Sequence, residues 1–156
     1  MPANLRPSAK AVVLRDGRLL VTRNLSEQDP AGEWLLLPGG GQRAGEDLHR
    51  TLIREVGEET GFEVRPGRLL WIREYIGAHH EFADFDSGSH QIDFMFAAEP
   101  LAQFGASEPD DHQVGWEWVP LGELADRRFY PGALLGPLAA WERGEDPGPV
   151  YLGDVN

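Results

Sequence analysis

Short apolar runs separated by turn residues make up much of the chain. Two runs, at residues 9–14 and 19–23, flank Asp16-Gly17, and this arrangement predicts a β-hairpin. Strands interspersed with helices in this order predict an α/β fold, in which helices flank a mixed β-sheet. The remaining strands are predicted at residues 34–37, 69–76, 91–98 and 115–119, and helical segments at residues 120–125 and 132–143.

One longer segment has helical periodicity. Asp47 is a good N-cap and Gly61 is a good residue to end a helix, so we predict a helix between them. At about 100° per residue the apolar side chains of this segment form one continuous sector, which predicts that the helix packs on the core. The apolar residues are Leu48, Leu52, Ile53 and Val56.

Three glutamates, Glu55, Glu58 and Glu59, fall in the sector that adjoins this apolar stripe. Residues three and four apart share a helix face, so the carboxylates gather beside the core, where their mutual repulsion is poorly screened. A solvated acidic face would more commonly alternate with Lys or Arg at i+4, and here Arg54 is the one base nearby. Such a cluster indicates a cation, and a divalent metal that holds a phosphate is the obvious candidate.

Composition narrows the class of protein. The 156 residues, 41% of them hydrophobic, with five tryptophans and seven phenylalanines, are typical of one globular domain. The absence of cysteine excludes disulfides, zinc–thiolate sites and thiol nucleophiles. No apolar run approaches the length of a membrane span and no signal peptide is recognised, so we expect a cytoplasmic protein without a membrane partner.

The net charge of −12 argues against non-specific binding to DNA or RNA, which depends on basic residues that meet phosphates. An acidic surface would also repel a free polyphosphate, but a bound Mg²⁺ would locally reverse that field. Alternatively, the negative surface only keeps the protein soluble. That explanation suits most of the 26 acids, but not those between residues 40 and 62.

We expect three segments along the chain. Residues 1–8 read as a flexible leader, residues 9–143 as one domain, and residues 144–156 as a Gly- and Pro-rich tail that runs over the surface. No internal repeat or linker divides the domain.

The segment from residue 40 to residue 62, GGQRAGEDLHRTLIREVGEETGF, resembles the signature of the Nudix hydrolases. The resemblance implies an α/β/α sandwich that hydrolyses a nucleoside diphosphate linked to another group X, with Mg²⁺ or sometimes Mn²⁺ as the metal. Trp34, Pro38 and Trp118 agree with the family pattern outside the signature. Within it the matched positions are Gly40, Glu46, Arg54, Glu55, Val56, Glu58, Glu59, Gly61 and Phe62.

By this resemblance, Glu55, Glu58 and Glu59 would bind the metal, aided by the backbone carbonyl of Gly39. Arg54 would form a salt bridge that orients a catalytic glutamate. A carboxylate whose proton affinity is tuned by its neighbours can act as general base, and within the signature Glu55 or Glu58 is the candidate.

Three further signature residues would have supporting roles. Glu46 would support the geometry of the loop and helix, or contact the metal through water. Gly40 and Gly61 would serve the backbone rather than the chemistry.

A later loop offers another carboxylate. Many Nudix relatives place a glutamate, as a metal ligand or base, where this chain has Asp110 and Asp111, and Asp111 aligns best by its distance to Trp118. The alternative is a simple turn, because Pro-Asp-Asp is good turn sequence. Both interpretations stay open.

Several residues are candidates for substrate contacts: Trp34, His80, Phe82, Phe85 and Tyr130. The aromatic side chains could stack on a base, and the histidine could line the mouth of the pocket. Single aromatic residues near strands are more often part of the core, and a histidine in a polar loop is often only solvated. Phe82 and Phe85 are the more informative pair, because they lie in a polar stretch.

The markers that relatives carry for ADP-ribose, dinucleoside polyphosphates or coenzyme A are missing. Their absence favours a nucleoside triphosphate or a nucleotide sugar as the substrate. The alternative function is a non-hydrolytic Nudix-fold module that binds a nucleotide, although such modules usually lose signature glutamates. An isoprenyl diphosphate isomerase is disfavoured because its best-known enzymes need a cysteine. Relatives are frequently dimers, which leaves a homodimer open.

Overall fold

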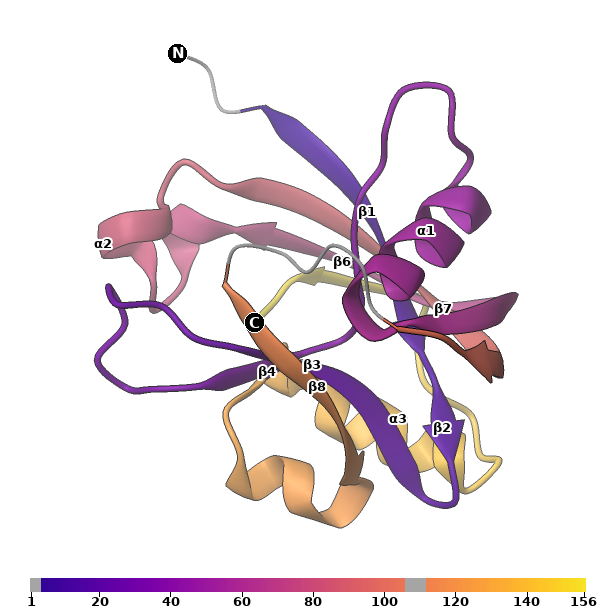
Figure 1. Ribbon diagram of the computed structural model, residues 1–156. Helices are drawn as coiled ribbons and strands as arrows, with labels where there is room; N and C mark the ends of the chain where they lie inside the picture. The colour runs from indigo at the N-terminus through magenta and orange to yellow at the C-terminus, as the bar shows by residue number, and fades with distance from the viewer. Residues whose placement is uncertain (1–3, 106–111) are drawn as a thin grey trace.

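A mixed five-stranded sheet lies at the centre of the protein (Figure 1). The structure is a computed structural model that describes residues 4–105 and 112–156. The strand order is β10-β6-β7-β1-β5; β1 pairs with β7 and β10 with β6 in parallel, and the other two pairs are antiparallel. The strands are β1 (Leu5–Val12), β5 (Gly39–Gly41), β6 (Phe62–Ile76), β7 (His90–Gln103) and β10 (Tyr151–Asp154).

A second sheet has the order β2-β3-β4-β9, with β8 also paired to β3. The predicted hairpin is confirmed: β2 and β3 are antiparallel, and Asp16 and Gly17 both have positive φ (53° and 72°), as a two-residue hairpin turn requires. The strands are β2 (Leu14–Arg15), β3 (Arg18–Asn24), β4 (Trp34–Leu36), β8 (Gln113–Pro120) and β9 (Phe129–Tyr130).

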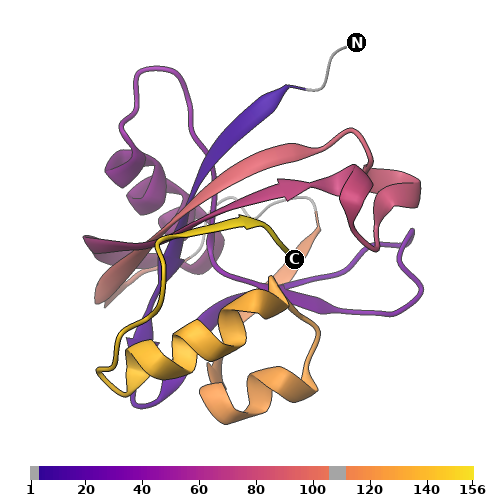
Figure 2. The same ribbon diagram turned by 180° about the vertical axis from the view of Figure 1, so that it is seen from behind.

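Two principal helices cover the strands from different sides, α1 (Leu48–Thr60) and α3 (Leu135–Glu142) (Figures 1 and 2). Each packs on its own apolar cluster. The first includes Leu52, Val56, Ala9 and Phe96, and the second includes Leu138, Trp71, Leu35 and Met95. The short helices are η1 (Gly77–His79), α2 (Ala83–Asp86), η2 (Leu121–Asp126) and η3 (Gly132–Leu134). The expected α/β architecture, mixed strands flanked by helices, is confirmed, although the strands form two sheets.

Both ends of the described chain differ from expectation. Strand β1 begins at Leu5, so half of the expected leader is paired with β7, where Leu5 meets His90 and Ser8 meets Asp93. Part of the expected surface tail forms β10 on the edge of β6. Both segments are ordered by partners far away in sequence, which local patterns do not reveal.

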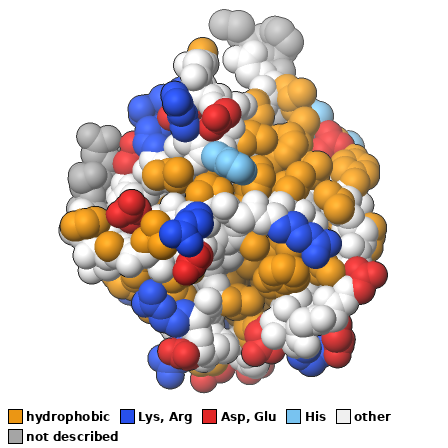
Figure 3. Space-filling model, turned by 90° about the vertical axis from the view of Figure 1, so that its right-hand side faces the viewer, with side chains coloured by type: hydrophobic (Ala, Val, Ile, Leu, Met, Phe, Trp, Pro, Cys, Tyr) orange, Lys and Arg blue, Asp and Glu red, His pale blue; other side chains and the backbone are white. Residues whose placement is uncertain are grey.

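Charges of both signs are dispersed on the face shown in Figure 3, where they interrupt a broad apolar area. The net charge of −12 is therefore not gathered into one acidic patch on that face. No helix in the described part of the chain is long and apolar enough to cross a membrane.

Candidate active site

Helix α1 has the predicted boundaries. The side chain of Asp47 accepts a hydrogen bond from the backbone N–H of Arg50 at 2.8 Å, which makes it the N-cap. At the other end Gly61 adopts a left-handed conformation (φ 75°), and its N–H bonds to the carbonyl of Gly57 at 2.9 Å. These two caps fix which carboxylates of the helix face the neighbouring strands.

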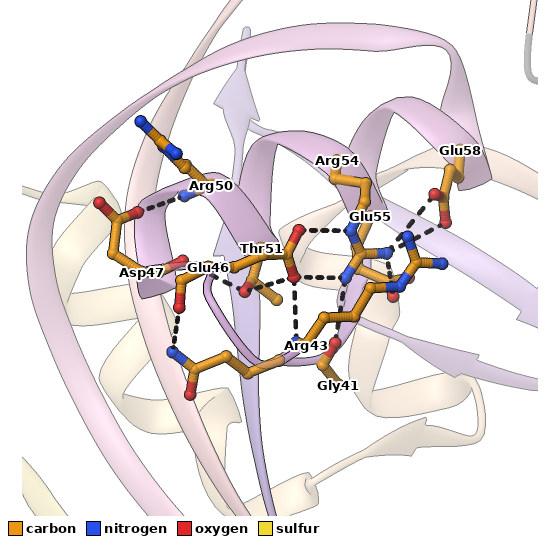
Figure 4. A network of polar contacts seen from close by, with 10 residues as sticks. Gly41, Arg43, Glu46, Asp47, Arg50, Thr51, Arg54, Glu55 and Glu58 are labelled. Atoms are coloured by element: carbon orange, nitrogen blue, oxygen red, sulfur yellow. Dashed lines mark hydrogen bonds and ion pairs between the residues drawn. The ribbon is translucent and has the colours of Figure 1, made fainter.

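Arg54 lies at the centre of a polar network between the loop and the helix (Figure 4). Its Nε and Nη2 donate to the two carboxylate oxygens of Glu46, at 2.7 and 2.9 Å, and Nη2 also donates to the carbonyl of Gly41 at 3.1 Å. Nη1 donates to Glu55 at 2.9 Å and lies 3.4 Å from both oxygens of Glu58. One guanidinium thus fixes the relative positions of three signature glutamates, and its contact with Glu46 has the bidentate geometry that arginine gives to carboxylates.

The Glu46 carboxylate is held strongly in its ionised form. The hydrogen bond from Arg54 is the main cause, with help from the N–H of Arg43 and the hydroxyl of Thr51, at 3.0 and 3.2 Å. Together they lower the pKa of Glu46 from 4.5 to about 2. Glu46 therefore remains an anion that supports Arg54 over the whole physiological pH range.

Glycines bring strand β5 close to two glutamates of α1. Glu55 and Glu59 are 9% and 5% exposed, and Glu59 Oε1 accepts a hydrogen bond from the N–H of Gly39 at 2.6 Å. A Cβ at Gly40 would come within 2.6 Å of the Glu55 carboxylate, and a Cβ at Gly39 within 2.0 Å of the Ala9 carbonyl. At Gly39 no side chain fits because the clash is with backbone, and at Gly40 a side chain would push the Glu55 carboxylate aside.

The side chains at this site have the oxygen donors that a hard divalent cation prefers, although in the structure these oxygens are paired with nitrogen donors. Glu55, Glu58 and Glu59 supply carboxylate oxygens, two of the three are buried, and Gly40 leaves open the space beside Glu55 that a Cβ would fill. In the described residues no group of three or more His, Asp or Glu side chains is arranged to hold a metal. Nitrogen donors engage the oxygens instead: Arg54 at Glu55 and Glu58, and the backbone of Gly39 at Glu59.

Asp111 lies outside the described residues, but the chain just after it is tied to α1. Gln113 Nε2 donates to the carbonyl of Glu59 at 2.7 Å and to that of Gly115 at 3.1 Å. Its Oε1 is buried and has no hydrogen-bond partner in the described part of the chain. The sequence analysis missed Gln113, because its role depends on the fold of β8 against α1.

A cavity of about 330 Å³ lies beside the strands β4 and β6. Four of the predicted substrate contacts line it, namely Trp34, Phe82, Phe85 and Tyr130. The ring of Phe82 packs edge-on against Tyr130, with centroids 5.4 Å apart, and lies 5.6 Å from the ring of Phe85. This aromatic lining suits a flat, apolar group such as a nucleobase.

His80, the fifth candidate, does not line this cavity. Its ring stacks on Tyr75, with centroids 5.4 Å apart, and its Nε2 lies 2.6 Å from Asp154 Oδ1. His80 therefore contacts the C-terminal strand β10 instead of the cavity.

The cavity also contains polar residues that the sequence analysis missed, among them Arg73, Gln91 and Asn156. Arg73 is 7% exposed, and its Nε donates to the buried carboxylate of Asp93 at 2.8 Å. An arginine directly after the apolar run at residues 69–72 of the predicted strand was the available signal, because a buried charge needs a partner and often has a function.

A model of the NUDIX domain matches residues 4–135. The chain belongs to the Nudix family. The chain is 32% identical over 157 residues to the RNA pyrophosphohydrolase of Sphingopyxis alaskensis, an alignment that covers 85% of this chain and 94% of that protein. It is also 33% identical over 69 residues to the CTP pyrophosphohydrolase of Escherichia coli, which covers 44% of this chain and 46% of that protein.

Solved Nudix structures have the same fold. A NUDIX hydrolase from Nitrosomonas europaea superposes with a TM-score of 0.74 at 19% identity and covers 92% of each chain. A MutT NUDIX hydrolase from Burkholderia pseudomallei gives a TM-score of 0.60 at 26% identity, covering 76% of this chain and 85% of that one. The chain is thus a Nudix pyrophosphohydrolase, of a family that acts on small nucleotides and generally uses a divalent metal.

Proposed function

We propose that this Nudix enzyme hydrolyses a diphosphate bond in a nucleoside diphosphate linked to a group X, with Mg²⁺ as the metal. A nucleoside triphosphate or a nucleotide sugar is the favoured substrate. The observation that carries the proposal is the aromatic cavity close to the carboxylates of α1.

The cavity and the carboxylates are joined by a very short piece of chain. Leu36 lines the cavity, and Gly39, three residues further on, bonds to Glu59. Three residues span at most about 10 Å. A nucleotide whose base enters the cavity therefore keeps its phosphates within reach of the glutamates.

Glu55, Glu58 and Glu59, with the carbonyl of Gly39, are the groups that would hold Mg²⁺. When bound, the metal neutralises the charge of the diphosphate and makes bound water more acidic. Arg54 keeps Glu55 and Glu58 in fixed positions through its contacts at 2.9 and 3.4 Å.

In the reaction, the oxygen of a water molecule forms a bond to phosphorus while the bond from phosphorus to the bridging oxygen breaks. The water proton passes to a carboxylate, Glu55 or Glu58, and the leaving phosphate keeps the electron pair of the broken bond. Asp111 is the other candidate for this proton. If Asp111 is the base, Asp111→Asn should lower kcat more than it raises KM. An unchanged kcat would mean that this loop has only a structural role.

Two relatives bear on the choice of substrate. The similarity to a protein named CTP pyrophosphohydrolase supports a nucleoside triphosphate. The similarity to a protein named RNA pyrophosphohydrolase makes RNA the second candidate. The net charge of −12 weighs against RNA, because an extended chain of phosphates needs basic residues along its path.

A release assay with Mg²⁺ tests the proposal. The panel comprises nucleoside triphosphates, nucleotide sugars, ADP-ribose, dinucleoside polyphosphates and a 5′-triphosphorylated RNA oligonucleotide. We expect turnover with a triphosphate or a nucleotide sugar. If only the RNA is turned over, the proposed substrate class is wrong. If a nucleotide binds but no product forms, the non-hydrolytic alternative is supported.

Glu59→Gln is the matched inactive variant. The amide oxygen of glutamine can still accept the hydrogen bond from Gly39, so the fold should persist while a charged metal ligand is lost. We expect kcat to fall by at least about 100-fold. Substantial activity in this variant would contradict the metal assignment.

A further inference from the structure

The C-terminal strand β10 brings the end of the described chain to the cavity. It runs parallel to β6, with Gly153 opposite Arg73 and Asp154 opposite Glu74 (Figure 2). The N–H of Val155 continues the pairing with a bond to the carbonyl of Glu74 at 3.1 Å. Asn156 thereby reaches the lining of the cavity.

Asp154 holds the first turn of the segment that carries the cavity's phenylalanines. Its Oδ1 accepts from the backbone N–H of Ile76 at 3.0 Å and lies 2.6 Å from His80 Nε2, while Oδ2 lies 2.7 Å from His79 Nδ1. Partial desolvation raises the pKa of Asp154, but hydrogen bonds with His80 and His79 outweigh it and bring that pKa below its usual range. One anion therefore engages three donors, on Ile76, His79 and His80.

Residues 77–89, the aromatic segment, form a compact unit. The segment closes on itself through a bond from Gly77 N–H to the carbonyl of Ser89 at 2.9 Å. A Cβ at Gly77 would overlap the carbonyl of Asp86, so its two ends are in close contact. Phe82 and Phe85 extend from this unit into the cavity.

The tail makes three more contacts around the cavity. Asn156 Nδ2 donates to Glu81 in the aromatic segment at 2.8 Å. Arg73 Nη1 donates to the carbonyl of Val155 at 2.7 Å and to Asn156 Oδ1 at 3.3 Å. The tail therefore holds both the aromatic segment and the guanidinium of Arg73 in the cavity wall.

We propose that Asp154 is a positioning residue, which holds the aromatic segment so that Phe82 and Phe85 present a preformed stacking surface to the nucleobase. This inference rests on the proposed function. If the anchor is lost, the segment must be ordered when the substrate binds, and that cost weakens binding. The carboxylates of α1 are not among the contacts of Asp154, so the chemical step remains intact.

The test compares Asp154→Ala with Asp146→Asn in the full chain. Asp146 is an acid in the same tail whose side chain, in the described part of the chain, accepts only from the N–H of Gly148, a bond that asparagine can keep. We expect Asp154→Ala to raise KM, and the Kd of a non-hydrolysable nucleotide analogue, about tenfold or more, with kcat unchanged. Asp146→Asn should leave both constants at wild-type values.

Amide hydrogen exchange of residues 77–89 in the free protein gives a readout that needs no substrate. Faster exchange in Asp154→Ala but not in Asp146→Asn supports the anchor, and the milder Asp154→Asn serves if the alanine variant does not fold. An unchanged exchange rate in Asp154→Ala, or a fall in its kcat at constant KM, overturns the proposal that Asp154 anchors the segment. If the wild type hydrolyses no nucleotide, the proposed function fails, while amide exchange still decides whether Asp154 anchors the segment.

Discussion

Gly40 lies where strand β5 passes the carboxylate of Glu55, and its replacement by alanine measures how closely that carboxylate must be placed. A Cβ at this position would lie 2.6 Å from Cδ and Oε2 of Glu55 and 2.9 Å from Oε1. Ordinary van der Waals contact begins at 3.4 Å, so the carboxylate must move by about 0.8 Å. Arg54, which bonds to Glu55 at 2.9 Å, has to adjust with it.

The expected cost falls on catalysis rather than on folding. A misplacement of about 1 Å in a catalytic group can lower a rate about 100-fold, so we expect kcat of Gly40→Ala to fall by roughly that factor. The atoms that must yield are the end of a flexible side chain, so the loss of stability should stay near the lower end of the range of about 1–3 kcal/mol for overpacking.

Two assays separate these effects: kcat from phosphate or pyrophosphate release at saturating Mg²⁺, and the free energy of unfolding from urea titration. Gly57→Ala, in α1, is the control, because among the described residues a Cβ there meets only the carbonyl of Phe62, at the start of β6, at 3.9 Å. It should keep full activity and gain up to about 1 kcal/mol from helix propensity. If Gly40→Ala keeps the wild-type kcat, the position of Glu55 does not limit the reaction and our reasoning fails.

Three further predictions concern stability. Glu46 has a pKa of about 2 in the fold against an ordinary 4.5, so its stabilising contribution is present above pH 4.5 and is lost as the pH falls toward 2. Glu46→Gln should therefore lower the free energy of unfolding at neutral pH and flatten its decline in acid, measured by urea titration at several pH values; parallel curves would contradict this. Leu52→Ala, at a fully buried position of α1, should cost about 2–5 kcal/mol in the same titration, and a negligible cost would show that α1 does not depend on this contact. Asp93→Ala leaves Arg73 buried without its ion-pair partner and should cost about 3–5 kcal/mol; a loss near zero would mean that water replaces the carboxylate.

Local chemistry explains why α1 could be predicted from the sequence. The N-cap at Asp47 and the left-handed Gly61 are set by residues within one turn of each helix end. The placement of Glu55 and Glu59 beside the core follows from helical periodicity alone. The proximity of Gly40 to Glu55 was not predictable in this way, because it depends on how β5 packs against the helix.

Long-range partners explain what could not be predicted. Ser8 is buried because its hydroxyl donates to Asp93 at 2.7 Å, across 85 positions of sequence, so a polar residue near the N-terminus was assigned to a leader instead of a strand. Arg73 needs Asp93 on β7 and Val155 beyond β10 to satisfy its guanidinium. Among the aromatic side chains of the cavity, Phe82 and Phe85 were the easiest to recognise, because they are conspicuous in a polar stretch.

Strand β10 also has a consequence for how the molecule avoids self-association. It pairs with Ile72, Arg73 and Glu74, in the more apolar half of β6, and so occupies hydrogen-bonding groups that an open edge would offer to another chain. The other half of β6 contains Pro66 and charged side chains at Glu63 and Arg65, with irregular pairing to β7 at Glu63/Val64 and Pro66/Leu69. Proline, charge and irregularity are the features that make an edge a poor template for pairing. The edge of β6 is thus protected in two ways: by proline, charge and irregular pairing in one half, and by pairing with β10 in the more apolar half. The seven residues from Val150 to Asn156 therefore keep that apolar half from pairing with another chain.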